Sequence, residues 1–452
     1  MSEDSVGKSL IVVANRLPVD RCGDHWSASP GGLVSALAPV VRERGGIWVG
    51  WTGACDEHFD PFEFDGISLE PVALSSAELR EYYEGFSNAT IWPLYHDQVV
   101  APQFHRSWWN AYQVINERFA AAVARCAAPG ATVWIHDYQL QLVPNLLRQR
   151  RPDVAIGYFS HIPFPPSGLF SQLPWRDEIL SGLLGADVIG FQRESDVTNF
   201  STALDKLAPK DSRRLTLALG SYPISIDVED VENAAHSETV LREAEAVRAD
   251  LGSPETLLLG VDRLDHTKGI IERLLAYEEL LDEGALDPCR TCLVQVAVPS
   301  REGMAAYQEL RENVEQLVGR INGKFAGLSG TVVHYLYRSY TFESTIALYL
   351  AADALLVTAL RDGMNLVAKE YVCARRGRGG ALVLSEFAGA ADELTEALLI
   401  NPHNLNKLKS AITQAVEMDA EEANSRIDVM ADVVTGHDVH DWARHFLDAL
   451  ES

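Results

Sequence analysis

The chain has 452 residues, 47% of them hydrophobic, which is enough material for two or three domains with separate cores. Its formal net charge of -26 argues against a nucleic-acid-binding or anionic-membrane surface, because such partners require a surface rich in Lys and Arg. A phosphate site in this chain must therefore be a local cluster of cations.

Six cysteines are scattered along the chain, and the close pair Cys289 and Cys292 has no second pair at metal-ligand spacing. Two thiols beside a buried strand is the simpler interpretation of this pair. The sequence starts without a signal-peptide pattern, and no apolar run reaches the roughly 18 residues of a membrane helix. We therefore expect a reduced, cytoplasmic protein that does not span a membrane.

In the first half, short apolar runs alternate with helical patterns, which is typical of parallel sheets covered by helices. A long helix is predicted over 108–126, and strands are predicted at 10–18, 45–51, 132–137, 155–161 and 187–191. After the first strand, Gly31 and Gly32 open another helical pattern. Paired glycines let a backbone approach a diphosphate closely, but they also simply turn a chain.

Several polar and aromatic residues of this half have two interpretations. Asp137 ends an apolar strand, where it could cap the next helix or meet a sugar hydroxyl. His161 lies in a proline-rich loop, and a lone loop histidine is more often structural than catalytic. A set of aromatic side chains suits either an ordinary core or a sugar-binding surface, namely Tyr83, Trp92, Trp108 and Trp109.

Between the halves, residues 226–255 are polar and acidic and are predicted to be helical at their end, so a domain boundary is placed at 225–227. The second half repeats the alternating pattern. Helices are predicted over 270–281, 304–321 and 365–376, and strands at 256–264, 292–299, 331–337, 354–360 and 381–386. The fold class is therefore α/β, with two Rossmann-like doubly wound domains whose strand carboxyl ends face a central cleft.

Two motifs of the second half suit an anionic ligand. Arg263 leaves a predicted strand, and Lys268 precedes a helix whose first amide groups also favour anions. The alternative is a pair of solvated loop cations. In the second motif, residues 360–370, the amides at 365–367 could bind phosphate and Glu370 could accept hydrogen bonds from ribose. Capping by Asp362 or Asn365 would explain part of this motif without a ligand.

The combination of motifs resembles one known family, the bacterial trehalose-6-phosphate synthases. The resemblance runs from about residue 10 to the last helix and rests on ANRLP, SPGGL, YYEGFSNATIWPLYH, HDYQLQLVP, HIPFPP, GVDRLDHTKG, INGKF, LRDGMNLVAKEY and LSEFAGAA. It implies a retaining GT-B glycosyltransferase that makes α,α-trehalose 6-phosphate from glucose 6-phosphate and UDP-glucose or GDP-glucose. It also implies an acceptor domain over 1–225, a donor domain over 226–435 and a C-terminal helix, 436–452, that packs back on the first domain.

The resemblance assigns residues to three groups. The catalytic group is Arg263, Lys268, Asp137 and His161. The donor-binding group is Gly31, Gly32, Arg263, Lys268, Tyr340, Asp362, Met364, Asn365, Leu366, Val367, Ala368, Lys369 and Glu370. The acceptor-binding group is Arg16, Trp48, Tyr83, Trp92, Asp137 and Arg301, with Arg16 and Arg301 toward the phosphate. No metal, cofactor, nucleic-acid or membrane partner is implied, and a homo-oligomer is left open.

The chain departs from the usual motif sequences of the family at four positions, and none of these departures removes a charge from the implied site. They are His266, Gln139, Ser160 and Ala359. Thr345 stands where leucine is expected in the region that resembles the nucleobase pocket. An added hydroxyl there could bond a purine, which is the basis of the hypothesis that the donor is GDP-glucose. Two alternative functions are glucosylation of a smaller acceptor such as glycerol 3-phosphate, and a catalytically silent sugar-phosphate sensor.

Overall fold

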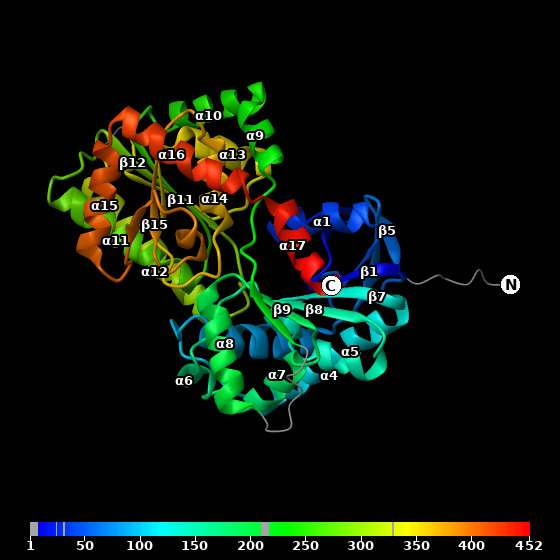
Figure 1. Cartoon of the computed structure of the whole chain (residues 1–452). Helices are drawn as coiled ribbons and strands as arrows, with labels where there is room; N and C mark the ends of the chain where they lie inside the picture. Colours follow the sequence, from blue (N-terminus) through cyan, green and yellow to red (C-terminus); the bar gives the residue numbers. More distant parts are fainter. Residues whose placement is uncertain (1–7, 24, 30–31, 209–216, 328–329) are drawn as a thin grey trace. The chain divides into compact units, whose positions relative to one another are not determined.

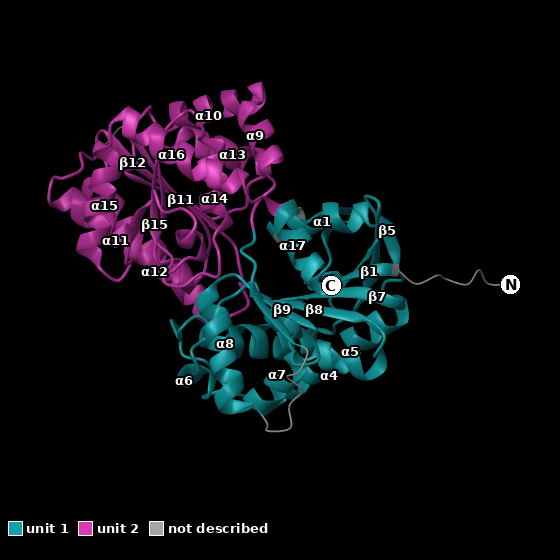
Figure 2. Ribbon diagram, in the orientation of Figure 1, with its two compact units in different colours: residues 1–224, 440–452 teal, residues 225–439 magenta. Residues whose placement is uncertain are grey.

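The computed structural model of the protein describes residues 8–23, 25–29, 32–208, 217–327 and 330–452 (Figure 1). The chain divides into two compact units (Figure 2). Unit 1 comprises residues 1–224 and 440–452, and unit 2 comprises residues 225–439. The chain therefore leaves unit 1 near the boundary placed from the sequence and returns to it for the last helix.

Unit 1 is built on an eight-stranded sheet with the order β10-β9-β8-β7-β1-β4-β6-β5, in which all neighbours are parallel except β5 and β6. A separate antiparallel hairpin joins β2 and β3. The strands are β1 (Lys8–Arg16), β2 (Val19–Cys22), β3 (His25–Ala28), β4 (Ile47–Trp51), β5 (Phe62–Phe64), β6 (Ile67–Pro71), β7 (Ala127–His136), β8 (Ala155–Phe159), β9 (Val188–Phe191) and β10 (Ala218–Ser221).

The helices of unit 1 cover both faces of this sheet, with α1 and α17 on one side and α4, α5 and α7 on the other (Figure 1). The helical segments are α1 (Gly32–Glu43), α2 (Ser76–Glu78), η1 (Leu79–Ile91), α3 (Trp92–Tyr95), α4 (Arg106–Cys126), η2 (Tyr138–Leu140), α5 (Val143–Arg150), α6 (Ser167–Phe170), α7 (Arg176–Leu183), α8 (Glu194–Leu207) and α17 (Val439–Glu451).

The alternation of side chains along β7 explains how both faces are filled. Val133 and Ile135 belong to the core shared with α4, while Trp134 points the other way and stacks on Phe446 of α17, with 4.8 Å between ring centroids. Gly157 of β8 and Gly190 of β9 make room for the same phenyl ring. A Cβ atom on either glycine would lie 2.7 Å from it.

Unit 2 is built on a six-stranded, fully parallel sheet with the order β13-β12-β11-β14-β15-β16. Counted along the chain this is the order 3-2-1-4-5-6 of a dinucleotide-binding sheet. The strands are β11 (Thr256–Arg263), β12 (Thr291–Val298), β13 (Val333–Leu336), β14 (Ala354–Val357), β15 (Ala381–Ser385) and β16 (Leu398–Ile400). The predicted fold class, α/β with doubly wound parallel sheets, is confirmed.

Helices cover both faces of this second sheet as well. One core contains residues of α11, α12 and α15, and the opposite helices pack together through α13 with α10 and through α14 with α9 and α16. The helical segments are α9 (Val228–His236), α10 (Glu238–Asp250), η3 (His266–Lys268), α11 (Ile270–Asp282), α12 (Ala305–Phe325), α13 (Phe342–Ala351), α14 (Leu366–Ala374), η4 (Gly389–Asp392), α15 (Leu405–Glu417) and α16 (Ala420–Thr435).

The acidic segment 226–255 differs from its prediction. It was expected to be helical only at its end, but α9 and α10 make it helical almost throughout. Asp227 starts the first helix, because its carboxylate accepts a hydrogen bond from the amide of Asp230 at 3.0 Å. Within the described ranges, no helix has the length and apolar character needed to cross a membrane.

The seating of α17 gives a stability prediction. Phe446 is fully buried, so Phe446→Ala should leave a cavity over Gly157 and Gly190 and cost about 3–5 kcal/mol of unfolding free energy. Urea unfolding followed by tryptophan fluorescence would measure it. Val114→Ala is the control, because Val114 is 54% exposed on α4 and its truncation should change stability by no more than about 0.5 kcal/mol. Equal effects of the two substitutions would contradict this account of α17.

Candidate active site

In unit 2 the candidate cations lie where the strand order of the sheet reverses. β11 ends at Arg263 and its neighbour β14 ends at Val357, so the loops that follow them leave the same edge of the sheet. A doubly wound sheet of this order binds ligands in the crevice outside these two strand ends. The structure therefore brings together the two motifs selected from the sequence, at 263–269 and 360–370.

Backbone contacts hold the two loops together. The amide of Leu360 donates to the carbonyl of Thr267 at 2.7 Å, and the hydroxyl of Thr358 donates to the carbonyl of Gly269 at 2.8 Å. Gly269 has a φ of +62°, and a Cβ atom there would lie 2.0 Å from the carbonyl oxygen of Thr358. Only glycine meets both requirements, so this residue fixes the distance between the loops.

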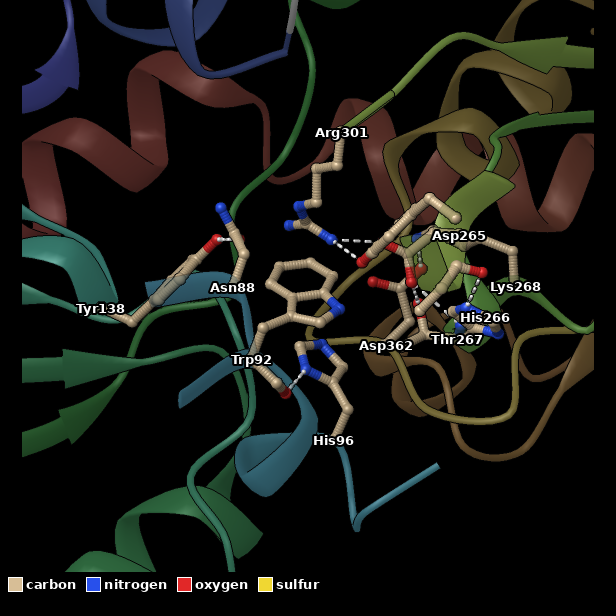
Figure 3. Close-up of polar contacts among 12 residues, drawn as sticks. Asn88, Trp92, His96, Tyr138, Asp265, His266, Thr267, Lys268, Arg301 and Asp362 are labelled. Atoms are coloured by element: carbon tan, nitrogen blue, oxygen red, sulfur yellow. Dashed lines mark hydrogen bonds and ion pairs between the residues drawn. The ribbon is translucent and has the colours of Figure 1, made fainter. Parts of the chain in front are cut away.

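Lys268 points across this junction at Asp362 (Figure 3). Its Nζ lies 2.5 Å from Oδ2 of Asp362, and the two side chains are only 12% and 16% exposed. Asn365 also donates to the same carboxylate oxygen, at 3.1 Å. The alternative of a solvated loop cation is therefore wrong for Lys268, whereas Arg263 at the end of β11 is exposed.

The start of α14 combines capping with open amide groups. The side chain of Asn365 accepts a hydrogen bond from the amide of Ala368 at 3.0 Å, and Asn365 adopts a φ of +126°. The capping interpretation is thus confirmed for Asn365. The side-chain cap does not use the amides of Leu366 and Val367, which lie in the first turn, where the helix dipole favours an anion.

Three side chains of the implied donor group point into the interior of unit 2 rather than out from this edge. Met364 is 5% exposed, and Ala368 and Lys369 are fully buried. The ammonium of Lys369 forms an ion pair with Glu393, although burial lowers the pKa of this lysine. These residues contribute to a ligand site through the backbone they support.

Glu370 is held by a buried tyrosine of α13. The hydroxyl of Tyr349 donates to Oε2 of Glu370 at 2.7 Å, and Tyr349 is fully buried. Burial raises the pKa of Glu370, and the hydrogen bond from Tyr349 opposes that rise. The carboxylate therefore has a fixed direction, with one oxygen bonded to the protein.

Arg301 also belongs to unit 2, unlike the other residues of the implied acceptor group. It follows β12 with a φ of +51°, and its Nη1 lies 2.5 Å from Oδ2 of Asp265, with both side chains nearly inaccessible to solvent. Tyr307 donates to the same Asp265 oxygen at 3.1 Å. Oδ1 of Asp265 accepts the amide and hydroxyl hydrogens of Thr267. One buried carboxylate thus joins Arg301 to the loop that carries Lys268.

In the region that resembles the family's nucleobase pocket, the polar side chains form hydrogen bonds mainly with other groups of the protein. The Nε of Arg338 donates to the hydroxyl of Tyr340 at 2.9 Å, and its guanidinium lies over the same ring, 4.7 Å from the centroid. The hydroxyl of Thr345 donates to the carbonyl of Thr341, the N-cap residue of α13, at 2.8 Å. Its hydrogen is therefore used within the helix.

In unit 1 the strand order reverses between β1 and β7, and Arg16 lies at the end of β1. Its guanidinium bonds to Oδ1 of Asp20 at 2.6 Å and lies over the ring of Trp51, 5.1 Å from the centroid. Trp48 is fully buried, and its indole nitrogen donates to the carbonyl of Arg16 at 3.0 Å. Trp48 therefore acts on the backbone of Arg16. Gly31 lies outside the described residues, and Gly32 begins α1.

Asp137 follows β7 with a φ of +76° and stands at the N-cap position of η2, but its side chain makes no capping hydrogen bond there. Its Oδ1 instead accepts the amide hydrogen of His161 at 3.2 Å. The ring of His161 continues into a buried chain, in which Nε2 lies 3.0 Å from Nδ1 of His136 and Nδ1 lies 3.4 Å from Nε2 of Gln192. Burial lowers the pKa of His136 well below its ordinary value and lowers the pKa of His161 to about 3.

Trp92 and Trp109 of the aromatic set belong to the core of unit 1, and Tyr83 lies partly buried against that core. Trp109 is ordinary core, since it is 4% exposed and stacks on Trp175 with centroids 5.3 Å apart. Tyr83 lies in η1, a segment with wide π-type turns, and is only partly buried next to Trp51. Trp92 follows η1 directly and packs on His96, 4.1 Å away between ring centroids. π-type turns are often found at functional sites.

The four residues that depart from the family motifs either form local hydrogen bonds or are buried. His266 Nε2 lies 3.0 Å from the carbonyl of Ala306, and the hydroxyl of Ser160 donates to the carbonyl of Ile162 at 2.9 Å. Gln139 and Ala359 are 8% and 1% exposed. These four residues therefore leave the charged groups at the carboxyl ends of the strands in place in each unit.

Sequence reasoning missed the groups that hold the candidate side chains: Asp20, Tyr349, Asp265, His136 and Gln192. For Asp265 a signal existed, because a lone carboxylate between two cations in GVDRLDHTKG requires a partner when it is buried. Asp20 is only four residues from Arg16 in the sequence, and the other three groups depend on tertiary packing. Among the residues described, no group of three or more His, Cys, Asp and Glu side chains is arranged to hold a metal ion.

The buried histidine pair gives a prediction for acid stability. A histidine whose folded pKa is about 3 stays neutral in the folded protein but binds a proton in the unfolded chain below its ordinary pKa of about 6.5. Unfolding free energy should therefore fall by about 1.4 kcal/mol per pH unit for each such histidine as pH decreases from about 6.5.

Urea unfolding of the wild type and of His161→Gln at several pH values between about 7 and about 5 would measure this slope. Whatever the stability of the variant at neutral pH, its unfolding free energy should fall less steeply with decreasing pH, by the slope that one histidine contributes. An identical slope in both proteins would show that His161 is protonated in the folded state.

Known proteins share this architecture over the whole described chain. Residues 8–452 match the profile of glycosyltransferase family 20. A protein of Mycobacterium sp. (strain KMS) named trehalose-6-phosphate synthase is 51% identical, over 98% of this chain and 94% of its own. A protein of the same name from Mycolicibacterium smegmatis is 50% identical, over 98% of this chain and 92% of its own.

Solved structures give the same result. A UDP-forming α,α-trehalose-phosphate synthase from Burkholderia xenovorans, in complex with glucose 6-phosphate, aligns with a TM-score of 0.90 and 33% identity, covering 98% of this chain and 100% of that one. An E. coli structure bound with UDP-2-fluoro glucose aligns with a TM-score of 0.90 and 34% identity, covering 98% and 99%. The resemblance found in the sequence is confirmed: this chain belongs to glycosyltransferase family 20.

Proposed function

We propose that this enzyme transfers glucose from UDP-glucose to glucose 6-phosphate, releasing UDP and forming α,α-trehalose 6-phosphate. The observation that carries the proposal is the meeting of Lys268, Arg263 and the start of α14 at the strand-order reversal of unit 2. Two cations and oriented amides at such an edge suit a nucleoside diphosphate. The names of the relatives at about half identity agree with this reaction.

The cations would act on the leaving group. As the bond between the glucose anomeric carbon and the diphosphate breaks, negative charge grows on the diphosphate oxygen. Lys268 is already directed by Asp362, and the helix amides are fixed by the Asn365 cap, so little reorganisation is needed when that charge appears. Lys268 would then exchange part of its contact with Asp362 for a contact with the leaving oxygen.

The acceptor would be held by its phosphate and by its ring. Arg16, at the end of β1, supplies a guanidinium for the phosphate, and Tyr83 and Trp92 supply aromatic faces for the sugar. The anomeric hydroxyl of the acceptor then bonds to the donor carbon on the face the diphosphate leaves, and its proton passes to that diphosphate. Holding the two reactants together supplies much of the rate.

The hypothesis that the donor is UDP-glucose has more support than the hypothesis that it is GDP-glucose. The GDP hypothesis rested on a Thr345 hydroxyl available to a purine, but that hydroxyl donates to Thr341 at the N-cap of α13. The related enzymes from Burkholderia xenovorans are UDP-forming. The two alternative functions, a smaller acceptor and a silent sensor, are not needed to account for the paired charges at both edges. We further propose that the reaction requires no metal ion and takes place in the cytoplasm.

The function is tested by incubating the enzyme with glucose 6-phosphate and either UDP-glucose or GDP-glucose, in the presence of a chelator. Mass and anomeric analysis by NMR should identify α,α-trehalose 6-phosphate, formed faster from UDP-glucose. Faster turnover with GDP-glucose would overturn the donor assignment, and activity only after adding a divalent cation would overturn the metal-free mechanism. Donor turnover without a disaccharide phosphate would indicate another acceptor.

The hydrogen bond from Tyr349 to Glu370 gives a prediction on donor binding. If the ionised carboxylate of Glu370 accepts hydrogen bonds from the ribose hydroxyls, Tyr349→Phe should raise KM for UDP-glucose. The pKa of Glu370 rises further when the tyrosine hydroxyl that donates to it is removed. A hydrogen bond to a charged group contributes about 1.5–3 kcal/mol, so the acid limb of the KM profile should move up by about one pH unit or more.

Steady-state kinetics at several pH values would measure the shift, and KM for glucose 6-phosphate should stay unchanged. Tyr277→Phe is the matched control, since Tyr277 is another fully buried tyrosine of unit 2 but donates to backbone carbonyls. A KM for UDP-glucose that Tyr349→Phe leaves unchanged at every pH would exclude a role of Glu370 in donor binding.

A further inference from the structure

The side chain of Arg16 is held in place although it lies at the surface of unit 1. It is 43% exposed, and a long side chain at that exposure would ordinarily sample many rotamers. Here Asp20 bonds to one end of its guanidinium, and the indole of Trp51 lies beneath it, 5.1 Å from the ring centroid. The hydroxyl of Ser29 fixes Asp20 in turn, by donating to its other carboxylate oxygen at 2.7 Å.

The remaining side of the guanidinium faces Gly53. A Cβ atom on Gly53 would lie 2.5 Å from Nη2, 2.7 Å from Cζ and 3.0 Å from Nη1 of Arg16. The turn that carries Gly53 is itself fixed, because the indole nitrogen of Trp51 donates to the carbonyl of Ala54 at 2.7 Å. Trp51 therefore supports the guanidinium from below and also places the glycine beside it.

Gly53 has a positive φ of +92°, so a backbone requirement must be separated from the requirement for space. Other glycines of unit 1 show the difference. Gly130, with a φ of +71°, has no atom within 4 Å of a Cβ position, so its glycine serves the backbone alone. At Gly53 both requirements hold. The atoms that leave no space for a side chain belong to Arg16, the residue that the family resemblance assigns to the acceptor phosphate.

We propose that Gly53 is a positioning residue for the acceptor: its missing side chain lets the Arg16 guanidinium lie between Trp51 and Asp20, directed at the phosphate of the hexose phosphate. This inference rests on the proposed function, in which Arg16 binds that phosphate. Since the clash involves the far end of a flexible side chain, an alanine at position 53 displaces the guanidinium rather than the fold. The donor site of unit 2 is left unchanged.

The test compares the Kd for glucose 6-phosphate, measured by calorimetry, in the wild type, Gly53→Ala, Gly130→Ala, Arg16→Ala and the double variant of Gly53 and Arg16. Gly53→Ala should weaken binding about tenfold or more, which corresponds to about 1.4 kcal/mol, and Gly130→Ala should leave it unchanged. If Gly53 acts through Arg16, the alanine at 53 should have no further effect once Arg16 is truncated. The Kd for UDP should be the same in all five proteins.

Gly53→Asn guards against a variant that fails to fold, because asparagine tolerates positive φ better than alanine and still carries the Cβ atom. Thermal unfolding of each variant accompanies the binding measurements. Unchanged affinity in a folded Gly53→Ala or Gly53→Asn protein, or an equal loss in the presence and absence of the Arg16 side chain, would overturn the inference. Product formation by the wild type is measured separately, so failure to form trehalose 6-phosphate counts against the proposed function and not against the role of Gly53.

Discussion

The candidate donor site depends on the close approach of two backbones at Gly269. Because this residue has no side chain, the loop after β11 can lie against the carbonyl of Thr358, and the loop after β14 is held in register with it. Lys268 then reaches Asp362, the Asn365 cap opens α14 at the same place, and Asp265 extends the junction to Arg301. A bulkier residue at 269 would separate Lys268 from Asp362 and from the start of α14, since each of these groups is placed by one of the two loops.

A second regularity is electrostatic. In a chain with a net charge of -26, three of the cations implied in substrate binding already have carboxylate partners: Arg16 with Asp20, Lys268 with Asp362 and Arg301 with Asp265. Such partners keep the cations in a defined direction before an anion arrives and limit the cost of burying them. They also compete with that anion. A substrate phosphate must therefore offer more than a single carboxylate does, which a doubly charged, multidentate group can do.

The sequence predicted the parts of the molecule that follow from local pattern. Apolar runs such as 257–261 and 132–135 became central strands, and the motif order led to the family, because both signals are written in consecutive residues. What it did not predict depends on distant packing. The segment 226–255 was predicted to be helical only at its end, but α9 and α10 make it helical almost throughout, because one side of each packs on α13. The π-type turns of η1 and the partners Tyr349 and Gln192 likewise arise only when separate elements meet.

The return of α17 to unit 1 affects the order in which the protein can be completed during synthesis. The ribosome makes residues 8–224 first, but the side of the sheet that carries Trp134, Phe159 and the strand glycines is covered by Trp442 and Phe446, which come last. That aromatic surface must remain uncovered while all of unit 2 is translated. Nascent domains with exposed apolar surface are prone to misassociation, so this stretch of synthesis is the period when unit 1 has most need of a chaperone.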